Sequence, residues 1–73
     1  MKKYEIVAST CPDLEELRNP ETSGRYITSE VKIISAANET EAQNIFGESE
    51  YFDSFFKKNK LSECKIYSLG EKA

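Results

Sequence analysis

The sequence has no histidine and no tryptophan, and its 73 residues include only two cysteines, two prolines and three glycines. Histidine is the commonest general base and the commonest metal ligand, so its absence argues against most acid–base and metal-dependent catalysis. Cys11 and Cys64 lack the paired spacing of a zinc site, and Cys11 has no histidine to activate it as a nucleophile. We therefore expect no catalytic residue, no metal, no cofactor and no enzymatic activity.

Long hydrophobic runs are also missing. No apolar stretch approaches the length that spans a membrane, and the polar residues after Lys2 and Lys3 do not resemble a secretory signal. With two cysteines that can pair only if the fold brings them together, we expect reduced thiols, a cytoplasmic location and no contact with membranes. The chain is predicted to form one domain, residues 1–73. A domain of this size buries only about 60% of its unfolded surface, so a homodimer interface or a bound partner would supplement its core.

Charge is unevenly distributed along the chain. Ten basic and thirteen acidic residues give a net charge of −3. Residues 38–55 contain five acids and no lysine or arginine, whereas Lys57, Lys58 and Lys60 follow directly. Proteins that bind nucleic acid usually carry a basic domain or stripe, because neutralising phosphates supplies most of the non-specific affinity. The composition therefore argues against nucleic acid as the partner.

Hydrophobic periodicity and capping signals predict the secondary structure. Alternating residues indicate strands at 3–9, 25–35 and 63–70. A short helical turn is expected at 11–18, with Thr10 as its cap, followed by an exposed loop at 19–25. Asn38 and Glu41 have the spacing of a capping box, which predicts a helix that ends at Gly47. A second helix is expected after Ser49.

This order of elements predicts an α+β fold. A right-handed crossover between the second and third strands leaves a gap that the first strand can fill antiparallel to both. We expect a three-stranded antiparallel sheet of order 2-1-3 in a ββαβ arrangement, with one or two helices packed on one face. The opposite face is expected to be uncovered.

The helix after Ser49 carries most of the aromatic residues. At 100° per residue Phe52, Phe55 and Phe56 fall on one arc, with Tyr51 at its edge. We interpret this arc as the helical half of the core, which packs on strand residues such as Ile6. Tyr51 is expected to remain partly exposed.

The second strand is predicted to direct Ile27, Val31 and Ile33 toward the helices. Its alternate residues would then join strands one and three on the uncovered face, where large apolar side chains suggest a surface for a partner or for self-association. The candidate partner-binding residues are Val7, Tyr26, Thr28, Glu30, Lys32, Ile34 and Tyr67. A solvated face is the alternative interpretation. Two other surfaces are alternative candidates for partner binding. One is the acidic block at 38–53, which could mimic nucleic-acid phosphates, and the other is the loop at 11–25.

Two resemblances accompany these patterns. Residues 30–46, EVKIISAANETEAQNIF, are similar to the strand-then-helix passage of the archaeal ribosomal LX family, whose members are basic. This resemblance implies a small β-β-α-β fold and binding to ribosomal RNA. The chain, which has lysines directly after its first residue and is rich in Glu, Asn and Tyr, also resembles the small accessory proteins of tailed bacteriophages. This resemblance implies binding to one host protein, such as a defence protein.

Together these features predict a non-enzymatic protein–protein binding module. Its expected role is that of a phage-type inhibitor or modulator of a host defence protein, with a host protein as partner and a homodimer as a possible form. The alternative is a small RNA- or ribosome-associated protein that uses Tyr51, Lys57, Lys58 and Lys60.

Overall fold

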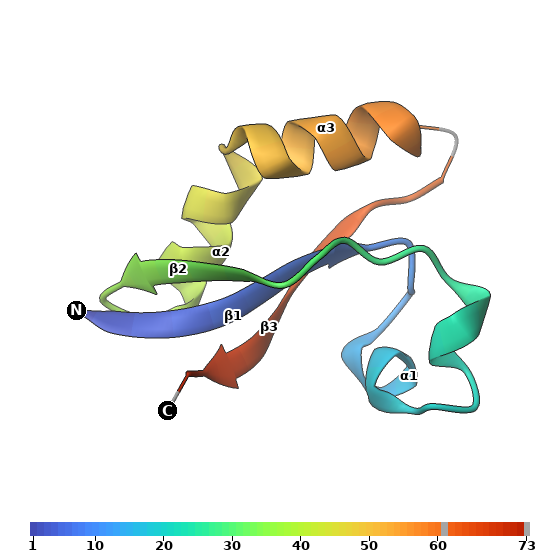
Figure 1. Cartoon of the computed structure of the whole chain (residues 1–73), viewed down its shortest axis with the longest axis horizontal. Helices are drawn as coiled ribbons and strands as arrows, with labels where there is room; N and C mark the ends of the chain where they lie inside the picture. Colours follow the sequence, from blue (N-terminus) through green and yellow to red (C-terminus); the bar gives the residue numbers. More distant parts are fainter. Residues whose placement is uncertain (61, 73) are drawn as a thin grey trace.

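The computed structural model describes residues 1–60 and 62–72. Within them the elements follow the order β1 (Lys2–Ser9), α1 (Leu14–Arg18), the 3-10 turn η1 (Ser23–Arg25), β2 (Lys32–Ala36), α2 (Glu39–Gly47), α3 (Glu50–Lys58) and β3 (Lys65–Glu71). The strands form an antiparallel sheet of order β2-β1-β3 (Figure 1). The predicted α+β fold and strand order are confirmed.

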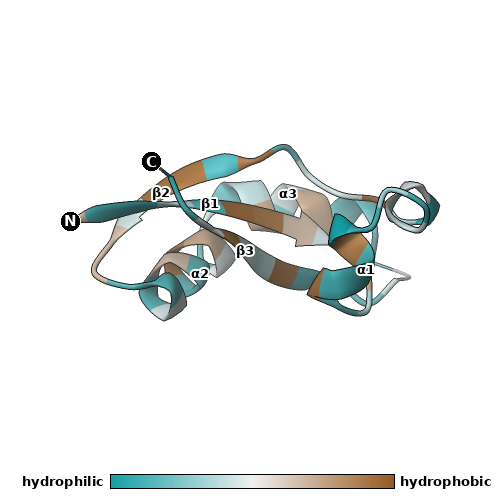
Figure 2. Ribbon diagram, turned by 90° about the horizontal axis from the view of Figure 1, so that it is seen from below, coloured by the Kyte–Doolittle hydropathy of each residue, from teal (hydrophilic) through white to brown (hydrophobic). Residues whose placement is uncertain are grey.

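The core lies between the sheet and α2. Helix α2 contacts all three strands and α3. Because β1 is the central strand its side chains are the most buried, and the second half of β1 is coloured hydrophobic in Figure 2. The buried cluster consists of Tyr4, Ile6, Ala8, Ala36, Ala42, Phe46 and Phe55. Fully burying a large side chain such as Ile6, Phe46 or Phe55 contributes about 1.5–3 kcal/mol relative to leaving it exposed.

Only some of the predicted helix caps form in the structure. The side-chain oxygen of Asn38 accepts a hydrogen bond of 2.8 Å from the backbone N–H of Glu41, which confirms the predicted start of α2. Helix α1 is capped by Asp13 instead of Thr10. Ser49 stands at the predicted cap position of α3, but its hydroxyl donates to the carbonyl of Phe46 over 2.6 Å. That bond fastens the turn between α2 and α3.

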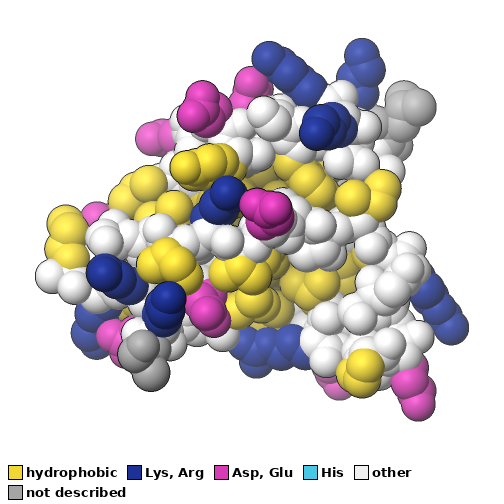
Figure 3. Space-filling model, in the orientation of Figure 1, with side chains coloured by type: hydrophobic (Ala, Val, Ile, Leu, Met, Phe, Trp, Pro, Cys, Tyr) yellow, Lys and Arg dark blue, Asp and Glu magenta, His cyan; other side chains and the backbone are white. Residues whose placement is uncertain are grey.

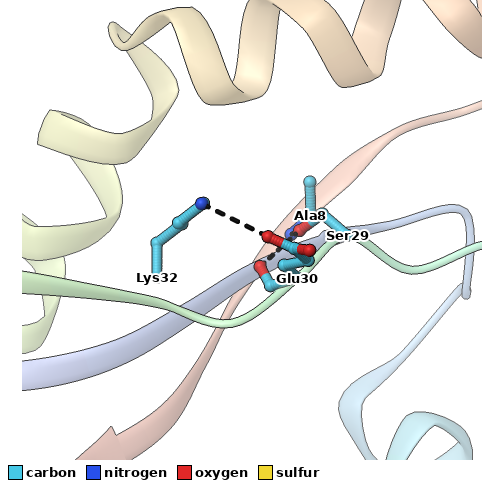
Figure 4. A network of polar contacts seen from close by, with 4 residues as sticks. All are labelled: Ala8, Ser29, Glu30 and Lys32. Atoms are coloured by element: carbon cyan, nitrogen blue, oxygen red, sulfur yellow. Dashed lines mark hydrogen bonds and ion pairs between the residues drawn. The ribbon is translucent and has the colours of Figure 1, made fainter.

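The long second strand predicted at residues 25–35 is shorter in the structure. Ser29 interrupts it, because the Ser29 hydroxyl accepts a bond of 2.9 Å from the Ala8 N–H while the Ser29 N–H donates to the Ala8 carbonyl at 2.8 Å (Figure 4). Beyond this point Ser9 and Thr28 form an isolated bridge, and the N–H of Thr10 donates to the Ile27 carbonyl over 3.0 Å. Between the Thr28 and Lys32 pairings the second strand advances four residues, whereas β1 advances three from Ile6 to Ser9. The strand therefore contains one extra residue, as in a β-bulge.

This extra residue reverses the faces predicted for β2. Lys32 and Ile34 lie opposite Ile6 and Tyr4, and Ile34 packs against the core. Ile33 lies on the opposite face and is 41% exposed. The assignment of Ile33 to the core and of Ile34 to the outer face was wrong, because a one-residue shift moves every later side chain to the other face.

The face opposite α2 and α3 is covered at one end. Val7 and Tyr67 pair across β1 and β3 on this outer face, and the Tyr67 hydroxyl reaches the carbonyl of Cys11. Val7 and Cys11 are almost completely buried. Figure 1 shows the loop with α1 on the side of the strands opposite α3. The expectation of a fully uncovered face is corrected here, since this loop shields the outer face around Val7.

Candidate functional site

The predicted partner-binding residues do not share one surface. Val7 is 1% exposed, and Ile34 packs against the core. Lys32 lies on the same face of the sheet as Ile34, and its ammonium group lies 4.5 Å from the centre of the Tyr51 ring. Glu30 is exposed and forms an ion pair of 3.5 Å with Lys32. The bulge explains why these residues lie on different faces. Even-numbered residues before the bulge point to one face of the sheet, and even-numbered residues after it point to the other.

The remaining predicted residues make internal hydrogen bonds. Tyr26 donates to the Glu16 carboxylate over 3.1 Å, and this bond raises the pKa of the Tyr26 phenol above its ordinary 10.0. The Thr28 hydroxyl lies 2.9 Å from the Ser9 hydroxyl. Tyr67 donates to Cys11, and burial is the main cause of its raised pKa. These groups hold the loop around α1 against the sheet.

A row of phenyl rings runs from the core to the surface through α3. Phe46 is fully buried and meets Phe52 edge to face, with ring centres 6.3 Å apart. Phe52 in turn meets Phe56, with ring centres 6.2 Å apart. Phe56 is 47% exposed, so the row ends in solvent. The predicted core arc is confirmed for Phe55 and is wrong for Phe56.

The exposed end of this row borders a hollow of about 480 Å³ where α2 meets α3. We call it the α3 hollow. It is lined by Gly47, Glu48, Ser49, Glu50, Phe52, Asp53 and Phe56. Two of these side chains are aromatic and three are acidic. Asp53 is paired with Lys57 at 3.0 Å, whereas Glu48 and Glu50 make no ion pair with any residue that the structure describes. The hollow therefore combines apolar surface with negative charge.

The basic and aromatic residues proposed for RNA binding are arranged differently. Lys57 is engaged by Asp53, and the Tyr51 ring is occupied by the ammonium group of Lys32. Tyr51 borders a second groove of about 330 Å³, lined by Ser29, Glu30, Lys32, Glu50, Tyr51 and Ser54. Lys58 and Lys60 are exposed near the end of α3. Of the residues proposed for RNA binding, Tyr51 and Lys57 therefore already have partners within the described part of the chain.

Sequence reasoning did not find the α3 hollow. The helical periodicity of α3 places Phe52 and Phe56 on one side, but it does not show that α2 leaves the far end of that side open. The acidic block at 38–55 was the available signal, because it supplies Glu48, Glu50 and Asp53.

Comparison with protein-family models, with curated proteins and with solved structures found no match to this chain. In the part of the chain that the structure describes, no group of acidic or cysteine side chains is arranged to hold a metal ion. None of the described helices is long and apolar enough to cross a bilayer.

Proposed function

We propose that this protein is a non-enzymatic binding module that captures another protein at the α3 hollow. The observation that carries the proposal is the aromatic row that ends with Phe56 exposed beside three carboxylates. Large aromatic side chains in a concave setting are typical of the residues that dominate binding energy at protein interfaces. The buried end of the row at Phe46 holds Phe52, and through it Phe56, so little conformational freedom is lost on binding.

The lining indicates the chemistry of the partner. An apolar side chain that covers Phe56 removes phenyl surface from water. A lysine or arginine beside it meets Glu48 and Glu50, and an arginine can also stack on the ring. We therefore propose a partner segment in which apolar and basic side chains alternate on one face. Within this function, the composition that resembles phage accessory proteins favours a cytoplasmic inhibitor or modulator of a host defence protein.

The test is affinity capture from bacterial lysate with two matched variants. Phe56→Glu adds a charge to the α3 hollow, whereas Ile45→Glu adds the same charge at a comparably exposed apolar position of α2. We expect one stoichiometric protein that is captured by the wild type and by Ile45→Glu, survives nuclease, and is lost with Phe56→Glu. With that protein purified, calorimetry should give a dissociation constant weakened at least about tenfold by Phe56→Glu.

Two outcomes contradict the proposal. Capture that is unaffected by Phe56→Glu would place the interface elsewhere on the molecule. Recovery of RNA or ribosomal particles that disappears with nuclease or rising salt would support the alternative function in RNA binding, because phosphate contacts weaken steeply with salt. Circular dichroism of each variant shows that lost capture is not lost folding.

A further inference from the structure

The outer edge of β2 has unpaired backbone groups. Strand β2 pairs with β1 on one side, and no described strand lies on its other side. The N–H of Lys72 donates to the carbonyl of Lys3. Because the backbone groups of successive strand residues point to opposite sides, the odd-numbered residues of β1 form backbone hydrogen bonds with β3 and the even-numbered residues with β2. Since Lys32, Ile34 and Ala36 lie opposite even-numbered residues, they bond to β1. Ile33 and Ser35 therefore direct their N–H and C=O groups outward.

The side chains along this edge are apolar or small. Val31 and Ile33 are 47% and 41% exposed, and Ser35 follows on the same outer face. Exposed edge strands are commonly protected by a lysine. Here the only lysine of β2, Lys32, lies on the inner face, over the Tyr51 ring and beside Glu30. Figure 3 shows hydrophobic side chains gathered around a basic and an acidic side chain on the face where β2 crosses in front of β1.

We propose that a second copy of this chain pairs antiparallel with this edge, about a twofold axis at Ile33. This register places Ile33 opposite Ile33, Val31 opposite Ser35, and Lys32 opposite Ile34. Large side chains then meet small or apolar ones, and no two like charges are directly opposite. A twofold axis at Lys32 would instead place the two lysines against each other. The edge is thus complementary to itself in the register centred on Ile33.

The assembly closes as a dimer. A twofold interface uses the same edge of both copies, which leaves no second β2 edge for further addition. Growth through β3 is opposed by its bulge, where pairing with β1 shifts between Glu5 and Ile6 and Gly70 adopts a φ of 114°. On the β2 side the break at Ser29 limits pairing to a few residues. An edge this short buries less than the 1,200–2,000 Å² of a standard interface, so we expect a dissociation constant on the order of micromolar.

Sedimentation equilibrium of the purified protein, from micromolar to millimolar concentration, tests the dimer. Ile33→Lys places two like charges across the twofold axis, while Ile45→Lys makes the same change on α2 at the same 41% exposure. We expect the wild type and Ile45→Lys to dimerise alike, and the dimer of Ile33→Lys to be weakened at least about tenfold. Thermal melting of both variants verifies that they are folded.

Cysteine cross-linking tests the register. The Cα atoms of a hydrogen-bonded antiparallel pair are about 5.5 Å apart, which a disulfide can span. In a Cys64→Ser background, oxidation of Ile33→Cys should give a covalent dimer, and Ile45→Cys should remain uncross-linked. A wild type that stays monomeric throughout, or a dimer unaffected by Ile33→Lys and not cross-linked at position 33, overturns the proposal. Phe56→Glu should dimerise normally, so failure of the α3 hollow and failure of the dimer give separate results.

Discussion

The hydroxyl of Tyr67 donates a hydrogen bond of 2.6 Å to the carbonyl oxygen of Cys11. Tyr67 belongs to β3, and Cys11 lies in the loop that follows β1. The bond joins residues 56 positions apart in sequence and fixes the loop over the buried side chain of Val7. Together with the bonds from Arg18 to the Leu69 carbonyl and from Lys65 to the Pro12 carbonyl, it holds α1 and its loop against the outer face of the sheet.

Removal of this hydroxyl should loosen the loop. We expect Tyr67→Phe to lower the free energy of unfolding by about 1 kcal/mol, because the Cys11 carbonyl loses a donor while the aromatic ring is kept. Urea denaturation followed by circular dichroism measures the change. Exchange of backbone amide hydrogens should increase at residues 11–26 and remain unchanged in α2. Uniform acceleration of exchange across the chain would contradict this local role.

The same bond predicts a dependence of stability on alkaline pH. Burial raises the pKa of Tyr67 above 10.0, so the native state holds this proton more tightly than the unfolded state. The contribution of Tyr67 is therefore fully present below about pH 10 and is lost as the pH rises through the native pKa. The difference in unfolding free energy between wild type and Tyr67→Phe should shrink above pH 10. A difference that stays constant to higher pH would exclude this linkage.

Adjacent isoleucines of β2 should respond oppositely to a charge. Ile34 packs against the core, so Ile34→Asp should destabilise the fold by about 3 kcal/mol or more, through lost packing and burial of a carboxylate. Ile33→Asp lies on the exposed outer face and should cost about 1 kcal/mol or less. Thermal melting at low protein concentration compares the two without self-association. The reverse ranking would show that the bulge at Ser29 does not shift the register.

Adjacent phenylalanines of α3 provide a second contrast. Phe55 is 8% exposed within the core, and Phe55→Ala should destabilise the protein by about 3–5 kcal/mol. Phe56→Ala should cost about 1 kcal/mol or less, because that ring is nearly half exposed already. Guanidinium denaturation gives both values. Equal losses would mean that Phe56 belongs to the core and is not part of a binding surface.

The close approach of α2 to β3 can be measured at Gly47. A Cβ atom on Gly47 would lie 3.0 Å from Cδ1 of Ile66, which is tighter than ordinary contact. Gly47→Ala gains up to about 1 kcal/mol of helix propensity but loses most of it to this overlap. In an Ile66→Val background, which lacks Cδ1, the same substitution should be more stabilising by at least about 0.5 kcal/mol. A double-mutant cycle measures this coupling, and additive effects would argue against the contact.

Predictions that depended on neighbouring residues were accurate for the start of α2 but not for the caps of α1 and α3. The start of α2 follows from Asn38, whose side chain can reach the Glu41 N–H without help from the rest of the fold. The alternation of β1 and β3 correctly predicted which side chains of these strands face α2. In both strands every second residue faces α2, without interruption as far as Ser68. The α3 periodicity identified Phe55 correctly. It failed for Phe56 because periodicity gives the direction of a side chain but not the extent of its cover.

The sequence by itself determined the order of the elements and the amphipathic character of α3, since these depend on local periodicity and capping. It also determined the β2-β1-β3 topology, since this follows from the handedness of the crossover. Only the tertiary structure decided which face Ile33 and Ile34 occupy. That choice depends on Ser29 bonding to Ala8, a contact between distant residues that inserts one extra residue into the strand. The α3 hollow was likewise decided by how α2 and α3 meet, because packing between elements determines which apolar side chains remain in water.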